Sequence, residues 1–112
     1  MFKYIVEFLG TCAFLLVILL TGQAIPIGLA LAAVIMLGGS ISGGHFNPAV
    51  SVMMAVKGKL KYADLVPYVI AQVLGGLLAL EISKRIKFRR KIAIAKQQYW
   101  KYFPSTKWSS TS

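Results

Sequence analysis

Three apolar runs dominate the first 83 residues of the chain. They cover about residues 4–21, 25–41 and 63–83, and each approaches the roughly 20 residues that a helix needs to cross a bilayer. The connection at residues 22–24 is short, which predicts that the second helix returns antiparallel to the first. The pattern therefore predicts an all-α membrane protein with three transmembrane helices.

A further apolar segment, residues 48–57, is too short to span, because ten helical residues reach only about 15 Å. Asn47 favours a helix N-cap, and Pro48 suits the first helical position, where the missing N–H would be unpaired anyway. The preceding Gly43 and Gly44 allow an irregular backbone. Membranes tolerate such a backbone only where it is buried in protein or lines a wet cavity. Residues 42–57 therefore predict a re-entrant loop and half-helix beside a water path.

The third run carries its own helix signals. Asp64 is expected to be its N-cap and Pro67 to lie in its first turn. Ala71, Gly75 and Ala79 recur every four residues, and such a stripe of small residues allows another helix to approach closely. Helix-on-helix packing is therefore expected to form the core.

Composition indicates a small membrane protein, and an enzyme is not expected because the sequence shows no Ser, His and acid arrangement and no phosphate-binding loop. The chain is 57% hydrophobic, with a mean hydropathy of +0.69, three acidic residues and a net charge of +10. Cys12 is the single cysteine, so no intrachain disulfide is expected. His45 is the single histidine, and its spacing from Cys12 and Glu7 fits no known metal-ligand pattern. No cofactor or metal is predicted, and the histidine is expected to position the loop.

Residues 4 to about 83 resemble the major intrinsic protein family of aquaporins and glycerol facilitators. The resemblance rests on three segments whose order and spacing are specific: Glu7-Phe8-Leu9-Gly10-Thr11, then Ile41-Ser42-Gly43-Gly44-His45-Phe46-Asn47-Pro48-Ala49-Val50, then Pro67-Tyr68-Val69-Ile70-Ala71-Gln72 with Gly75. It implies that residues 1–83 form one aquaporin-like half repeat.

The resemblance also implies a pore with its midpoint at the Asn47 amide. The half-helix presents a partial positive charge there, which orients water oxygen-first and opposes cations. Glu7 is expected to accept hydrogen bonds from the loop, since an intramembrane carboxyl is costly unless paired, and Gln72 to assist it. A cap without solute contact remains the alternative for Asn47, and a proton relay for Glu7. The expected pore-lining residues are Ile27, Gly43, Gly44, His45, Asn47, Pro48, Ala49 and Val50.

Three departures from the family pattern qualify this reading. A complete member carries a second, inverted half with another Asn-Pro-Ala followed by arginine, whereas these residues contain one motif, followed by Val50. Ile27 stands where water-selective relatives usually carry an aromatic residue, and Ser40 replaces a common histidine. A passive channel for water or small neutral solutes would therefore need an antiparallel homodimer or a complementary half. The alternative is a non-conducting remnant, or a small membrane protein that modulates a full-length channel.

Residues 84–112 form a basic, aromatic tail. Apolar residues recur at helical spacing from Phe88 through Ile92 to Tyr99, which predicts an amphipathic segment on the membrane surface, followed by a disordered end at 105–112. Membrane lipid is the expected partner, and nucleic acid is less favoured. The expected headgroup contacts are Lys84, Arg85, Lys87, Arg89, Arg90 and Lys91.

The orientation of the chain is left open by two rules that disagree. The positive-inside rule places the basic tail in the cytoplasm. The family resemblance places the N-terminus there, together with the polar turn at residues 57–61. With three spans, these two ends lie on opposite sides of the membrane.

Overall fold

The structure is a computed structural model that describes residues 1–102. Those residues form four helices: α1 (Phe2–Thr21), α2 (Ala24–Ser42), α3 (Pro48–Val56) and α4 (Tyr62–Tyr102). The three longer ones, α1, α2 and α4, are long and apolar enough to cross a membrane. The predicted all-α fold with three membrane helices is confirmed, and the chain is an integral membrane protein.

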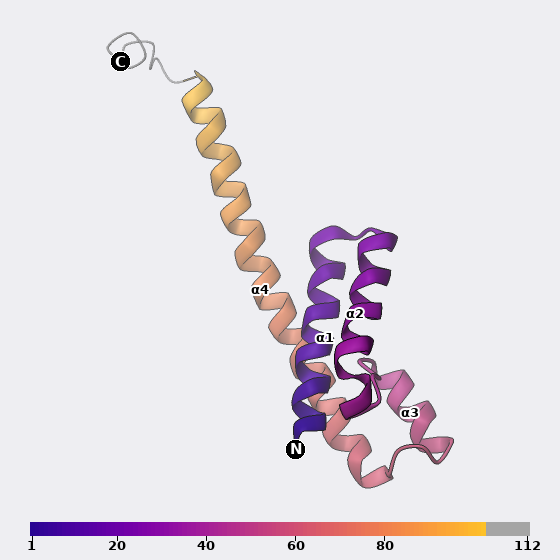
Figure 1. Cartoon of the computed structure of the whole chain (residues 1–112). Helices are drawn as coiled ribbons and strands as arrows, with labels where there is room; N and C mark the ends of the chain where they lie inside the picture. Colours follow the sequence, from indigo (N-terminus) through magenta and orange to yellow (C-terminus); the bar gives the residue numbers. More distant parts are fainter. Residues whose placement is uncertain (103–112) are drawn as a thin grey trace.

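Helix α1 is the centre of the bundle, with α2 packed on one side and α4 on the other (Figure 1). It ends at Gly22, whose left-handed φ of 62° lets the chain turn back directly into α2. The Gly22 N–H donates to the Ile18 carbonyl at 3.0 Å, which closes the last turn. Helix α3 packs against α4. The three long helices therefore support α3 and the loop that connects it to α2.

The small-residue stripe of α4 lies against α1. Ala71 and Ala79 are buried, and so is Gly75 between them. A Cβ on Gly75 would lie 2.5 Å from the Phe8 carbonyl oxygen and 3.2 Å from the Cys12 amide nitrogen. Only glycine allows the two backbones to approach this closely at that point.

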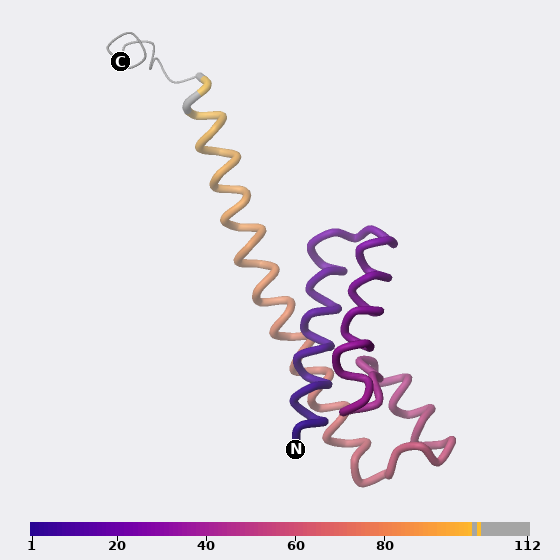
Figure 2. The backbone as a smooth tube through the Cα atoms, in the orientation of Figure 1, coloured from indigo at the N-terminus to yellow at the C-terminus, as the bar shows by residue number. Residues whose placement is uncertain are grey.

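The N-terminus and the start of α4 lie at the same end of the bundle (Figure 2). Lys3 Nζ lies 2.9 Å from Asp64 Oδ2, and the Tyr4 hydroxyl donates to Asp64 Oδ1 at 2.7 Å. The Tyr4 ring meets the Tyr68 ring edge-on, with centroids 5.8 Å apart. The N-cap prediction for Asp64 is wrong: α4 begins at Tyr62, and the carboxylate instead holds α1 to the first turn of α4. Pro67 lies inside the helix, beyond its first turn.

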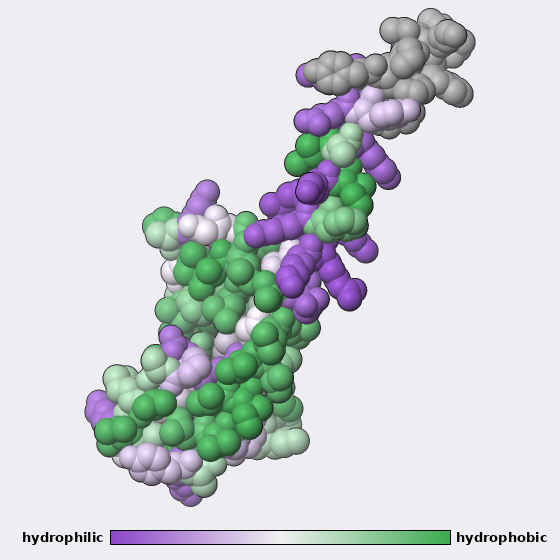
Figure 3. Space-filling model, turned by 180° about the vertical axis from the view of Figure 1, so that it is seen from behind, coloured by the Kyte–Doolittle hydropathy of each residue, from purple (hydrophilic) through white to green (hydrophobic). Residues whose placement is uncertain are grey.

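Helix α4 continues past Ser83, where the third span was expected to end. Its 41 residues correspond to a length of about 60 Å. Lys, Arg, Gln and Ala are good helix formers, so the helix persists after the apolar run ends. Figure 3 shows the change from the apolar bundle to a strongly hydrophilic extension. The predicted surface-lying segment is therefore a direct continuation of a membrane helix, and the predicted disordered end at 105–112 lies outside the described residues.

Candidate functional site

The loop between α2 and α3 has a left-handed backbone at three of its residues. Gly43 and Gly44 have φ values of 93° and 68°, and Phe46, a residue type that rarely adopts this conformation, has a φ of 52°. The Phe46 ring is 2% exposed and packs where glycines leave room. A Cβ on Gly10 would overlap the ring, and one on Gly38 would lie 3.5 Å from it. Burial of the aromatic ring between α1 and α2 therefore fixes the strained turn.

Glu7 on α1 joins the loop to the rest of the bundle. Its Oε2 accepts from the Ser42 hydroxyl at 2.6 Å and from the His45 N–H at 3.2 Å. Its Oε1 accepts from the Phe46 N–H and from Gln72 Nε2, each at 2.8 Å. The side chain is 0% exposed. A fully buried carboxyl is thus matched by four donors, two of which are loop amides that no helix can pair.

Gln72 on α4 extends this polar layer to α3. Its Nε2 also donates to the Ser51 hydroxyl at 2.8 Å, and that hydroxyl lies 2.9 Å from His45 Nδ1. The Tyr68 hydroxyl donates to the Ser42 carbonyl at 2.7 Å. The His45 ring also lies 5.2 Å from the Tyr68 ring, centroid to centroid, so His45 contacts both α3 and α4. Ser42 and Tyr68 entered the sequence prediction only within the family segments, with no role given to them, and Ser51 was not singled out. The small residues Ser51 and Ala55, four positions apart and both buried, mark the inner face of α3, and this spacing is the sequence signal that could have revealed it.

Asn47 is the N-cap of α3. Its Oδ1 accepts from the Ala49 N–H at 2.8 Å, and Pro48 occupies the first helical position. The Nδ2 group makes no hydrogen bond with the described part of the chain, and Asn47, Pro48 and Ala49 are all exposed. The positive end of α3 and two amide donors therefore face outward together.

The loop also presents acceptors. Within residues 1–102, the carbonyl oxygens of Gly43, Gly44 and His45 accept no hydrogen bond from the chain. Gly43 is exposed and Gly44 half-buried, whereas His45 is buried. Donors and acceptors for a small polar solute thus lie within the five residues from Gly43 to Asn47.

The other two expected pore residues are Val50, close to this surface, and Ile27, farther from it. Val50 is half-buried and lies in the first turn of α3. Ile27 is half-buried in the first turn of α2, near the α1–α2 connection, and α2 runs from there to the loop. The structure therefore groups the residues from Gly43 to Val50 and leaves Ile27 nearer the opposite end of the bundle.

The family model of the major intrinsic proteins matches residues 6–105. The chain belongs to the major intrinsic protein family. Similar members include a glycerol uptake facilitator protein-like 6 of Lactiplantibacillus plantarum, 43% identical over 88 residues, and an aquaporin-8 of Notomys alexis, 43% identical over 91 residues. An aquaporin Z of Brucella melitensis is 49% identical over 61 residues.

These matches cover 69%, 71% and 54% of this chain, respectively. The same alignments cover 40%, 35% and 27% of those relatives, so the chain spans well under half of their length. No solved structure matches the chain. The similarity therefore applies to one part of a complete family member.

Proposed function

We propose that the chain supplies one half of a transmembrane pore for water or small neutral solutes. The observation that supports this proposal most directly is the exposed start of α3. There the Asn47 side chain is fixed by the hydrogen bond that its Oδ1 accepts from the Ala49 N–H, and it faces outward. The half-helix and the loop are proposed to be re-entrant, entering the membrane from the end where α4 begins. Family membership supports the same reading.

The chemistry of this surface suits neutral solutes. A water molecule that reaches Asn47 would accept from Nδ2 and donate to the loop carbonyls, so it would exchange bulk hydrogen bonds for equivalent ones. A cation would meet the positive end of α3 and the amide donors, which raise its energy. The carbonyls of Gly43, Gly44 and His45 would line the part of the pore that leads to Asn47. Ile27 and Val50 would contribute apolar side chains to the pore wall.

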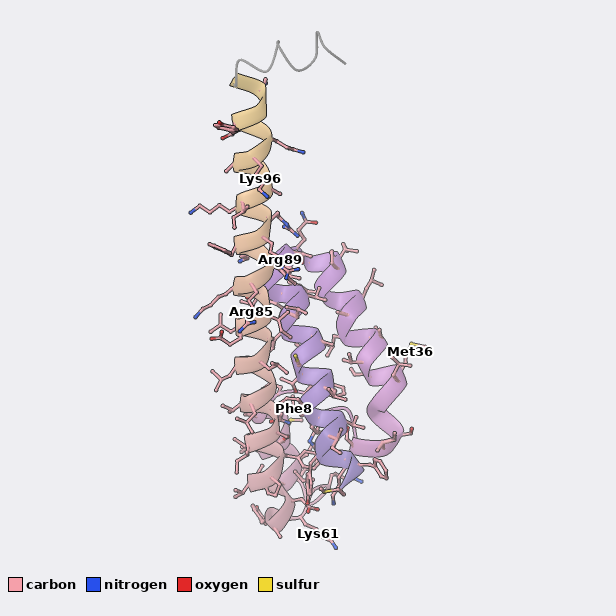
Figure 4. All side chains as sticks on the ribbon, turned by 90° about the vertical axis from the view of Figure 1, so that its left-hand side faces the viewer. Phe8, Met36, Lys61, Arg85, Arg89 and Lys96 are labelled. Carbon is pink, nitrogen blue, oxygen red and sulfur yellow. The ribbon has the colours of Figure 1, made fainter. Side chains whose placement is uncertain are left out.

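The proposed pore needs a second wall. In the described part of the chain, the Asn47 surface lies on the outside of the bundle, and Met36 of α2 is 83% exposed and points away from α1 (Figure 4). Inverted repeats meet at the midplane in transporters and channels of this type. A second copy in the opposite orientation would bring its own Asn47 to face the first. We propose this antiparallel pair as the conducting unit.

Osmotic swelling of proteoliposomes that contain this chain alone tests conduction. The expected result is water permeability well above that of empty vesicles, with no proton or cation leak. Permeability equal to that of empty vesicles, from chains whose helicity is intact by circular dichroism, would contradict self-assembled conduction. That outcome would favour the alternative, a non-conducting half or a modulator of a full-length channel.

The Asn47→Asp variant distinguishes the role of Asn47 as the N-cap of α3 from its proposed role in the pore. Aspartate is as good an N-cap as asparagine, so α3 should remain folded. It lacks the Nδ2 donors and adds negative charge, so we expect lower water permeability and a measurable cation leak. Glu81→Gln, on the exposed outer side of α4, is the matched control and should leave both unchanged. If Asn47→Asp behaves like this control, Asn47 acts as a cap only.

A disulfide crosslink tests the antiparallel pair directly. Cys12 must first be replaced by serine, because it is the only native cysteine. In that background Asn47→Cys should form a dimer in the membrane, since the two copies would face each other at this residue. Lys96→Cys, which would lie on opposite sides of the membrane in the two copies, should not crosslink.

A further inference from the structure

Beyond its apolar portion, α4 carries a dense cationic segment whose position the fold defines. Arg85 and Arg89 lie beside the upper ends of α1 and α2, and Lys96 lies beyond them (Figure 4). The helix is continuous through this region. The cationic segment therefore begins beside the last turns of α1 and the first turns of α2 and continues beyond them.

We name this segment the basic collar. Its members are the exposed cationic residues of two consecutive turns of α4: Lys84, Arg85, Lys87, Arg89, Arg90 and Lys91. At about 100° per residue they surround the helix, and the largest sector without a cation is also about 100° wide. The predicted apolar stripe through Phe88 and Ile92 is narrow, because Lys84 and Arg85 flank it at about 100° per residue. A helix lying flat would bury some of these charges, whereas a helix that leaves the membrane steeply would place all of them among headgroups.

The height of the collar matches the headgroup layer. From Lys84 to Lys91 the helix rises about 10 Å. The polar layer on each side of a bilayer is roughly 5–8 Å thick, and long basic side chains can reach along the helix to meet it. The last acidic residue before the collar is Glu81, whose Oε1 lies 3.9 Å from Lys84 Nζ. Residues 82–112 contain no acidic side chain, so the charge of the collar is otherwise uncompensated within the sequence.

We propose that the basic collar binds anionic lipid headgroups around α4 where it leaves the membrane. Phosphate oxygens from several lipids would meet cations on all sides of the helix. A nucleic acid would instead need a row of basic residues on one face above the membrane plane. Beyond the collar, the described helix offers only Lys96 and Lys101 for this. The encircling arrangement therefore fits a lipid annulus better than a single polyanion.

Spin-labelled lipids test this with the full chain in phosphatidylcholine bilayers. The measurement is the fraction of spin-labelled phosphatidylglycerol held at the protein, compared with that of spin-labelled phosphatidylcholine. The collar variant combines Arg85→Gln, Arg89→Gln and Arg90→Gln, and glutamine retains helix propensity. The control combines Lys57→Gln, Lys59→Gln and Lys61→Gln, which removes the same charge at the other end of the bundle.

The wild-type chain should hold phosphatidylglycerol with a several-fold preference that weakens in molar salt, where screening is strong. The collar variant should lose most of this preference, and the control variant, with Lys57, Lys59 and Lys61 replaced, should keep most of it. Equal loss in both variants would show a response to net charge alone and overturn the proposal. No lipid preference in the wild-type chain would also overturn it, as would collar-dependent binding of a duplex oligonucleotide in place of lipid.

Discussion

At the residue scale, Glu7 is a buried carboxyl whose two oxygens accept four hydrogen bonds from α2, the loop and α4. A carboxylate only accepts, which suits a site surrounded by donors. The amides of His45 and Phe46 have no helical partner, and lipid could not supply one. Glu7 therefore allows an irregular backbone to exist inside an otherwise apolar bundle.

Glu7→Gln should destabilise the fold although it preserves shape. The new amide group would face at least one N–H or O–H donor in place of an acceptor. Leaving such a buried donor unpaired costs about 1–3 kcal/mol. Titration of the helical circular-dichroism signal with dodecyl sulfate in mixed micelles would measure the loss. The matched control is Glu81→Gln, whose side chain is 63% exposed, and no measurable change is expected there. Equal stability of both variants would mean that the Glu7 contacts contribute little.

Part of this network could be predicted from the sequence. A glutamate in an apolar run requires partners, and the family resemblance directed this expectation to the amides of the glycine-rich loop, so the pairing of Glu7 with the loop was predicted although the two lie 35–39 positions apart. Ser51 and Tyr68 were not, because each contacts residues more than 20 positions away or on another helix. The partners of these hydroxyl groups can be identified only when the positions of α3 and α4 in the structure are known. Asp64 was misread as a cap for the same reason: its partner Lys3 lies 61 residues away.

At the element scale, the apolar runs predicted the three long helices, and Asn47 with Pro48 predicted the start of α3. The extent of α4 was not predicted, because hydropathy reports the apolar portion of a helix and says nothing of where the helix ends. The residues after Ser83 are polar but helix-favouring, and within residues 82–102 there is neither glycine nor proline to stop the helix. The third span and the helical segment from Phe88 to Tyr99 were therefore predicted as separate elements, whereas they belong to one continuous helix.

Gly75→Ala tests the close approach of α1 and α4. The added Cβ would meet the Phe8 carbonyl oxygen at 2.5 Å, and a backbone atom cannot move aside as a side chain does. Helix separation should cost about 1–3 kcal/mol, measured by the same dodecyl sulfate titration. Gly28→Ala on α2 is the control, because nothing lies within 4 Å of its added Cβ. A Gly75→Ala chain as stable as the control would show that the helices are not tightly held at this point.

At the scale of the whole molecule, the two ends of the bundle differ in charge. The polar turn between α3 and α4 carries Lys57, Lys59 and Lys61, and Lys3 at this end is paired with Asp64. The other end carries the basic collar. Because both ends carry basic residues, the positive-inside rule does not exclude either orientation. The basic collar has more basic residues than the turn, so the rule favours the orientation that places the collar in the cytoplasm. An antiparallel pair requires that both orientations occur in one membrane.

Single cysteines at the two ends would measure the orientation of the chain. In a Cys12→Ser background, Lys59→Cys and Lys96→Cys mark opposite ends of the bundle. If the chain inserts both ways, an impermeant maleimide added outside sealed vesicles should label roughly half of the chains at either position. Labelling should be complete once the vesicles are opened, which confirms that each thiol is accessible. If Lys59→Cys is labelled only from one side and Lys96→Cys only from the other, the orientation is fixed. The antiparallel pair would then be excluded, and a conducting pore would require a different, inverted half to face Asn47.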